Sequence, residues 1–262
     1  MSIFFFLVSF LASIAGAICG IGGGVIIKPT LDVFHLASVS TISFLSGCTV
    51  LAMSSYSVGK SFFSHDSRVN MKTGTPLAIG AAIGGVVGKN MFSGIMAMFA
   101  NPNTVGSVQA VCLLLITFGT LVYTLKKDII KTHHVESPVA CLIIGILLGV
   151  MSSFLGIGGG PINLVVLFFF FSMETKTAAQ NSLYIILFSQ ITSLIATLVT
   201  RTVPQFDPFS LILMVVGGIL GGMTGRIING RMDNKAVDKL FMAIMVIIIG
   251  ISIFNMVQYS GV

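Results

Sequence analysis

Two short glycine clusters are the residues whose types and spacing could form a binding site. The sequence Gly-Ile-Gly-Gly-Gly occupies residues 20–24 and returns at residues 156–160. Glycine allows the sharp turn that ends one helix and begins another, and the N–H groups at a helix N-terminus attract anions. Close packing between helices is the other interpretation of such clusters. We expect backbone N–H groups here to bind an anion, at Gly20, Gly22, Gly23, Gly24, Gly156, Gly158, Gly159 and Gly160.

One basic residue follows the first cluster. Lys28 lies four positions after Gly24 within an apolar segment, where an ammonium group is costly unless it meets an anion, a counter-ion or water. Asp32 lies four positions further on and could neutralise the charge. Two interpretations therefore stay open. Either Lys28 binds a substrate anion, or it pairs with Asp32 and extends toward the membrane interface.

Uncharged hydrogen-bond donors stand near both clusters along the chain. Asn163 follows the second cluster, Thr41 opens the apolar segment after the first, and Asn181 and Ser182 open the comparable segment in the second half. Such groups can orient an oxyanion without a formal charge, or they can join helices by hydrogen bonds. With the glycines and Lys28, they complete the predicted substrate site.

Enzymatic and cofactor-binding alternatives lack the residues that they need. The glycine clusters do not fit the dinucleotide pattern G-x-G-x-x-G, because Val25 and Pro161 stand where the third glycine belongs. No H-E-x-x-H motif or Ser, His and Asp constellation is present. We expect no enzyme activity, no cofactor and no metal site. Four isolated cysteines are expected to be buried thiols: Cys19, Cys48, Cys112 and Cys141.

The composition indicates a membrane protein. The 262 residues are 55% hydrophobic and 8% charged, whereas soluble domains carry about 25% charged residues. The mean hydropathy is +1.04, and 29 Gly and 21 Phe extend over the whole length. The net charge is +6, and the basic residues lie mostly in short loops between apolar segments. Basic residues in such loops orient a chain in the bilayer. The expected surroundings are the lipid bilayer of the cytoplasmic membrane, with several crossings and no nucleic acid partner.

An internal repeat organises the chain. The glycine clusters are 136 residues apart, and a second pattern keeps nearly the same register. Gly80, Gly84, Gly85 and Gly88 followed by Lys89 return 137 residues later as Gly217, Gly221, Gly222 and Gly225 followed by Arg226. The spacing by four in this second pattern favours close helix packing. We predict an N-terminal repeat at 1–125, a linker at 126–137 and a C-terminal repeat at 138–262.

Each repeat contains about five apolar segments, of which the second is short. About a dozen residues make ~18 Å of helix, which is less than a membrane crossing. If each short segment turns back as a hairpin, 11 of the 14 basic residues fall on one side, leaving Lys28, Lys89 and Arg201 on the other. A single crossing per pair divides them 7 to 7. The positive-inside rule therefore favours hairpins, with loops 60–73, 126–137 and 226–239 in the cytoplasm and both termini outside.

The predicted fold is all-α and polytopic, with two inverted repeats and helices interrupted at glycine. This build is common among secondary transporters, whose substrate site lies where interrupted helices meet. A passive anion channel could use the same helix N-termini, and a membrane subunit of a larger complex is a further alternative. Homo-oligomerisation is left open. The leading hypothesis is a carrier for a small anion.

The motifs resemble those of the sulfite exporter TauE/SafE family of membrane permeases. The resemblance rests on the paired clusters followed by Lys28-Pro29 and by Pro161, on Thr41 and Asn181-Ser182, and on the repeated G-x-x-x-G-G-x-x-G helix. It implies transport of sulfite, a sulfonate or a related organic anion, in either direction. A hydrophobic residue is common in the family where Lys28 stands, which implies a subgroup with a different or more strongly anionic preference.

Overall fold

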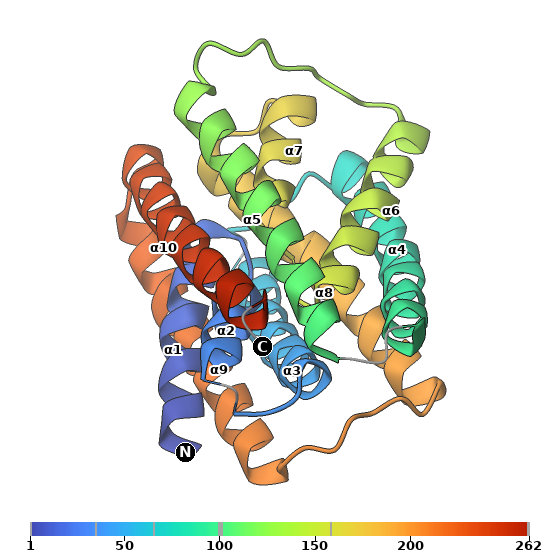
Figure 1. Cartoon of the computed structure of the whole chain (residues 1–262). Helices are drawn as coiled ribbons and strands as arrows, with labels where there is room; N and C mark the ends of the chain where they lie inside the picture. Colours follow the sequence, from blue (N-terminus) through green and yellow to red (C-terminus); the bar gives the residue numbers. More distant parts are fainter. Residues whose placement is uncertain (1, 35, 65, 99–101, 158, 261–262) are drawn as a thin grey trace.

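The computed structural model describes residues 2–34, 36–64, 66–98, 102–157 and 159–260. Within these ranges the chain forms ten helices and no strand (Figure 1). The predicted all-helical class is confirmed. The helices are α1 (Ser2–Cys19), α2 (Gly24–Val33), α3 (Val39–Phe63), α4 (Met71–Met98), α5 (Pro102–Lys126), α6 (Pro138–Leu155), α7 (Pro161–Phe171), α8 (Thr175–Val199), α9 (Pro208–Arg231) and α10 (Asn234–Ser260).

Six stretches of the described chain are long and apolar enough to cross a membrane. Their length and composition make the protein an integral, multi-pass membrane protein. These stretches are Val39–Phe63, Gly106–Lys126, Pro138–Leu155, Thr175–Val199, Pro208–Arg231 and Asn234–Gln258. Helices α2 and α7 are much shorter, at 10 and 11 residues.

Glycine, proline and short polar side chains set the helix boundaries. Pro161 and Pro208 stand at the first position of α7 and α9, where a missing N–H costs no helical hydrogen bond. The side chain of Ser38 accepts a hydrogen bond from the Thr41 N–H at 3.2 Å and caps α3. Gly156 ends α6 with φ +65°, a left-handed conformation that glycine adopts without strain.

The loops gather at two opposite ends of the helical bundle. Segments 66–70, 127–137 and 232–233 form one end, here called the linker end, because Arg226 contacts Asp66 and Lys176 donates to the Met232 carbonyl at 2.8 Å. Segments 36–38 and 200–207 form the opposite end, where Thr41 Oγ1 donates to the Gln205 carbonyl at 2.9 Å. Figure 1 shows segment 127–137 across the top of the view and segment 200–207 at the bottom.

The two short helices turn back toward different ends. Helices α1 and α2 form a hairpin that opens at the opposite end, where the rings of Phe4 and Phe34 lie 4.9 Å apart. Helices α6 and α7 form a hairpin that opens at the linker end, where the His133 and Val135 N–H groups donate to the carbonyls of Phe169 and Phe170 at 2.7 and 2.9 Å. The predicted segment division thus corresponds to helices, whereas the inverted-repeat relation and the repeat boundaries stay predictions.

Close backbone contacts join the predicted repeats. Helix α4 packs on α6, and α1 packs on α9. A Cβ atom at Gly84 would lie 2.1 Å from the Ile146 carbonyl oxygen, and one at Gly221 would lie 2.4 Å from the Phe10 carbonyl oxygen. A Cβ atom at Gly145 of α6 would in turn lie 2.2 Å from the Leu77 carbonyl oxygen. The predicted packing role of the G-x-x-x-G-G-x-x-G helices is confirmed.

Gly84→Ala is expected to destabilise the protein by forcing α4 and α6 apart. Overpacking of this kind costs roughly 1–3 kcal/mol. Gly94→Ala on the same helix is the matched control, because no atom lies within 4 Å of a Cβ at that position. The melting temperature of the purified protein in detergent should fall for Gly84→Ala and stay or rise for Gly94→Ala. Equal melting temperatures would contradict this account of the α4–α6 contact.

Candidate functional site

The two glycine clusters meet inside the bundle. A Cβ atom at Gly24 would lie 2.0 Å from the carbonyl oxygen of Ile157, so the first cluster touches the backbone of the second. A Cβ at Gly159 would lie 3.5 Å from the Ile21 carbonyl oxygen, and one at Gly160 would lie 3.7 Å from Val25 Cγ2. We call this contact between residues 20–24 and 156–160 the glycine junction. Gly158 lies outside the described residues.

Each cluster turns the chain at the end of a long helix. Gly20 has φ +75° and its N–H donates to the Gly16 carbonyl at 2.8 Å, so it ends α1 as Gly156 ends α6. A side chain at Gly20 would also collide with α8, because its Cβ would lie 2.3 Å from Ala179 Cα. Both turns therefore need glycine for conformation and for space.

The N-termini of both short helices adjoin the glycine junction. Gly24 begins α2 and Pro161 begins α7. The first turn of a helix has N–H groups without intrahelical partners, and its dipole places partial positive charge there. Two such ends, one from each half, concentrate positive potential at the junction. The Ile157 carbonyl lies against Gly24, so the junction is closed in this conformation.

Lys28 lies within the bundle beside the glycine junction. Its side chain is 3% exposed, and its ammonium group donates to Gln109 Oε1 and to the Leu155 carbonyl at 3.1 Å. Gln109 in turn donates from Nε2 to the Phe154 carbonyl at 2.7 Å. Asp32 and Lys28 line the same cavity. Lys28 thus connects α2 with α5 and with the last residues of α6, directly before the second cluster.

Two buried amides that bond α2 were not predicted from the sequence. Gln109 of α5 accepts from the Lys28 ammonium group, and Asn255 of α10 donates from Nδ2 to the Pro29 carbonyl at 3.0 Å. Both are buried. A single amide in an otherwise apolar span is the signal that could have identified each one, since a buried polar group needs a hydrogen-bond partner.

The structure does not bring the uncharged donors together. Thr41 lies at the opposite end, where it bonds Ser38 and the Gln205 carbonyl. Asn181 lies at the linker end and donates to the carbonyls of Arg68 and Thr177 at 3.1 and 2.8 Å. These two residues are therefore separated by much of the bundle. Their placement does not join Thr41 and Asn181 in one site with the glycine clusters.

The cavity around Thr41 is also poorly suited to an anion. It contains Asp207, whose carboxylate accepts hydrogen bonds from the Ser210 hydroxyl and N–H at 2.7 and 2.9 Å. These bonds hold the pKa of Asp207 below its usual range, so the group is a carboxylate at neutral pH. A fixed negative charge repels an anion.

Asn163 and Ser182 are both fully enclosed. Asn163 is in the first turn of α7, and its N–H donates to the Gly160 carbonyl at 3.1 Å. Within the described chain, Asn163 Oδ1 and Ser182 Oγ have no hydrogen-bond partner. Asn163 therefore adjoins the glycine junction, as predicted from its position, with unused hydrogen-bonding capacity.

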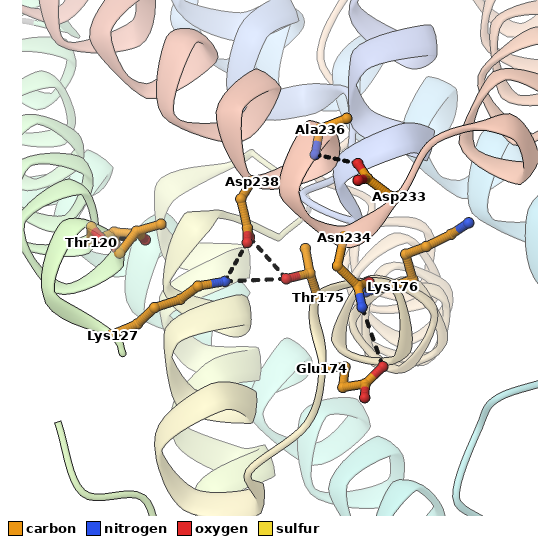
Figure 2. Close-up of polar contacts among 10 residues, drawn as sticks. Thr120, Lys127, Glu174, Thr175, Lys176, Asp233, Asn234, Ala236 and Asp238 are labelled. Carbon is orange, nitrogen blue, oxygen red and sulfur yellow. Dashed lines mark hydrogen bonds and ion pairs between the residues drawn. The ribbon is translucent and has the colours of Figure 1, made fainter. Parts of the chain in front are cut away.

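A polar network fastens the linker end (Figure 2). Lys127 Nζ lies 2.5 Å from Asp238 Oδ2 and donates to Thr175 Oγ1 at 3.2 Å, and Thr175 Oγ1 donates to Asp238 Oδ1 at 2.8 Å. These residues join the C-terminal side of α5 to α8 and α10. A second bond runs from Asn234 Nδ2 to Glu174 Oε2 at 3.2 Å. The members of this network are far apart in the chain, so no local sequence pattern predicts it.

Comparison with known proteins agrees with this architecture. The model of the sulfite exporter TauE/SafE family matches residues 5–253. The chain belongs to the sulfite exporter TauE/SafE family. It is 22% identical over 273 residues to the probable membrane transporter protein YunE of Bacillus subtilis (strain 168), covering 96% of this chain and 95% of that protein. No solved structure matches. This TauE/SafE protein is a membrane transporter and not an enzyme.

Gln109→Leu is expected to destabilise the protein, because the buried Lys28 ammonium loses an acceptor. Hydrogen bonds to charged groups contribute about 1.5–3 kcal/mol, so the melting temperature in detergent should fall by several degrees. Lys28→Met combined with Gln109→Leu removes both partners and should recover part of the loss. Strictly additive losses in this double-mutant cycle would contradict the coupling of Lys28 to Gln109.

Proposed function

We propose that the protein carries sulfite, a sulfonate or a related small organic anion across the cytoplasmic membrane by alternating access. The observation that carries the proposal is the glycine junction, where the N-termini of α2 and α7 from the two halves adjoin one another. Membership of the TauE/SafE family supports the class of substrate. In the proposed mechanism the anion binds between the two clusters when they separate.

The opposed hairpins support alternating access. Hairpin α1–α2 opens at the opposite end and hairpin α6–α7 opens at the linker end. Inverted repeats can exchange two conformations by moving one repeat against the other around a fixed site. Gly24 and Ile157 are in contact at the junction. If the two clusters separated on the side facing one end of the bundle, the N-termini of α2 and α7 would become accessible from that end only.

The residues beside the junction have distinct proposed roles. Backbone N–H groups of the two clusters donate to the oxyanion, and Asn163 supplies a side-chain amide. Lys28 raises the positive potential and holds α2 against the end of α6 through Leu155. Thr41 and Asn181 lie at the two ends of the bundle and act there, outside the central site.

Transport can be tested with purified protein in liposomes. Labelled sulfite and an alkyl sulfonate should enter with saturating kinetics, and unlabelled anion inside the liposomes should accelerate uptake of labelled anion. Such exchange distinguishes a carrier from a passive channel, which conducts without coupling the two fluxes. Non-saturating flux without exchange would indicate the channel, and uptake of neither anion would contradict the substrate class.

Gly24→Ala is expected to abolish uptake in the same assay. A Cβ at this position would overlap the Ile157 carbonyl and displace one cluster from the other. Gly59→Ala is the matched control, since no atom lies within 4 Å of a Cβ there. Wild-type uptake by a folded Gly24→Ala protein would show that the glycine junction is not needed for transport.

A further inference from the structure

Two cavities flank the glycine junction, one toward each end of the bundle. We call them the linker-end vestibule and the opposite-end vestibule. The residues that matter in the linker-end vestibule are Ala17, Ser57, Ala179, Gln180, Arg226 and Asn229. Those in the opposite-end vestibule are Ser43, Lys89, Phe92, Ser153, Gly156 and Leu194.

The two vestibules are built from corresponding positions of the repeat. Adding 137 to the residue number converts Lys89 to Arg226 and Phe92 to Asn229. The same shift of 137 relates Ser43 to Gln180 and Ser57 to Leu194. A shift of 136 relates Ala17 to Ser153. The same face of each repeat therefore lines a cavity on its own side of the junction.

Each vestibule extends to a different glycine cluster. Gly156, the first residue of the second cluster, lines the opposite-end vestibule directly. Ala179 lines the linker-end vestibule, and its Cα lies 2.3 Å from the place of a Cβ at Gly20, the first residue of the first cluster. Between the two clusters, Gly24 lies against the Ile157 carbonyl.

The lining of both vestibules suits an oxyanion. Among the residues that line them, the charged groups are cationic: Lys89 on one side, Lys176 and Arg226 on the other. Ser153 and Ser57 are each 5% exposed, and their hydroxyls have no hydrogen-bond partner within the described chain. Each cavity thus combines positive charge with an unused hydroxyl donor, which are the groups that bind anionic oxygens.

The positive charge of Lys89 is not neutralised by an acidic residue of the described chain. Its ammonium group lies 5.4 Å from the centre of the Phe92 ring, and no acidic group of the described chain pairs with it. A cation over an aromatic face is held in place without being neutralised. An anion in the opposite-end vestibule would therefore meet an uncompensated positive charge.

Arg226 has a weak and replaceable partner. Its Nη1 donates to the Ser57 carbonyl at 3.3 Å, and its Nη2 lies 3.5 Å from Asp66 Oδ2. The Asp66 side chain is 65% exposed, and such exposed ion pairs contribute little free energy. An oxyanion in the linker-end vestibule could take the place of the Asp66 carboxylate.

We propose that Lys89 and Arg226 are paired recruitment residues, each of which binds the transported oxyanion on its own side of the membrane. This assignment rests on the proposed transport of a small oxyanion and adds to it two peripheral binding sites outside the glycine junction. In each conformation the anion first binds in the open vestibule, beside its cation, and then moves to the adjacent cluster.

The test compares right-side-out and inside-out membrane vesicles from cells that produce the protein. With the linker end in the cytoplasm, Lys89→Gln should raise the KM for sulfite about tenfold in right-side-out vesicles, because a lost cation lowers the local anion concentration. Its KM in inside-out vesicles and its maximal rate should change less than about twofold. Arg226→Gln should give the reverse pattern, and Asp66→Asn should lower KM on the Arg226 side.

Matched variants separate recruitment from folding and from general surface charge. Arg201→Gln and Arg231→Gln remove exposed cations near the two ends and should leave KM unchanged. Lys89→Arg and Arg226→Lys keep the charge and should retain most of the wild-type affinity. If Lys89→Gln raises KM only in inside-out vesicles and Arg226→Gln raises it only in right-side-out vesicles, the pairing is supported and the linker end lies outside the cell.

Two results would count against the proposals, and they are distinguishable. If wild-type vesicles transport sulfite but both Gln variants raise KM equally from either side, or leave it unchanged, the paired recruitment sites are overturned and the transport function stands. If wild-type vesicles show no saturable uptake of sulfite or a sulfonate, the proposed function is contradicted, and this assignment falls with it.

Discussion

The close approach of backbones at glycine is the constraint on which the whole structure depends. In lipid there is little hydrophobic force between helices, so association relies on van der Waals packing and hydrogen bonds. Helices α4 and α6 approach through Gly84 and Gly145, and α1 approaches α9 through Gly221. These contacts hold each predicted repeat against the other along their length. They also fix where the ends of α1 and α6, and therefore the two glycine clusters, must lie.

The glycine junction follows from this packing and divides the interior. Ile21 and Ile157 are buried, and Gly24 touches the Ile157 carbonyl, so a layer of closely packed backbone lies between the two vestibules. Side chains larger than hydrogen at Gly20 or Gly24 would thicken or distort this layer. A packed barrier between two cavities suits a carrier, because a small displacement can close one route and open the other.

The sequence predicted the helices well and the side-chain partners poorly. Glycine, proline and charged loops mark helix ends locally, so the short second segment expected in the N-terminal repeat is helix Gly24–Val33 in the structure. The two clusters were identified together because one sequence motif occurs twice, and the structure brings them into contact. Partners such as Gln109 for Lys28 are 81 positions apart, and no local pattern encodes them. Thr41 and Asn181 also follow their clusters in sequence, yet the short helices α2 and α7 run toward different ends and place the two residues at opposite ends of the bundle.

The basic residues along the proposed pathway differ in how far their charge is already paired within the protein. Lys28, the cation nearest the junction, already donates to Gln109 and Leu155, so its charge is shared with neutral oxygens. Lys89 and Arg226, in contrast, lie in the vestibules. Lys89 has no acidic partner in the described chain and Arg226 has a weak one, so their positive charges can interact with a ligand. An unshared cation at the centre would bind the anion too tightly for release, since passage requires favourable but weak binding at successive sites. Weak recruitment at the periphery and dipolar binding at the junction satisfy this requirement with three basic residues.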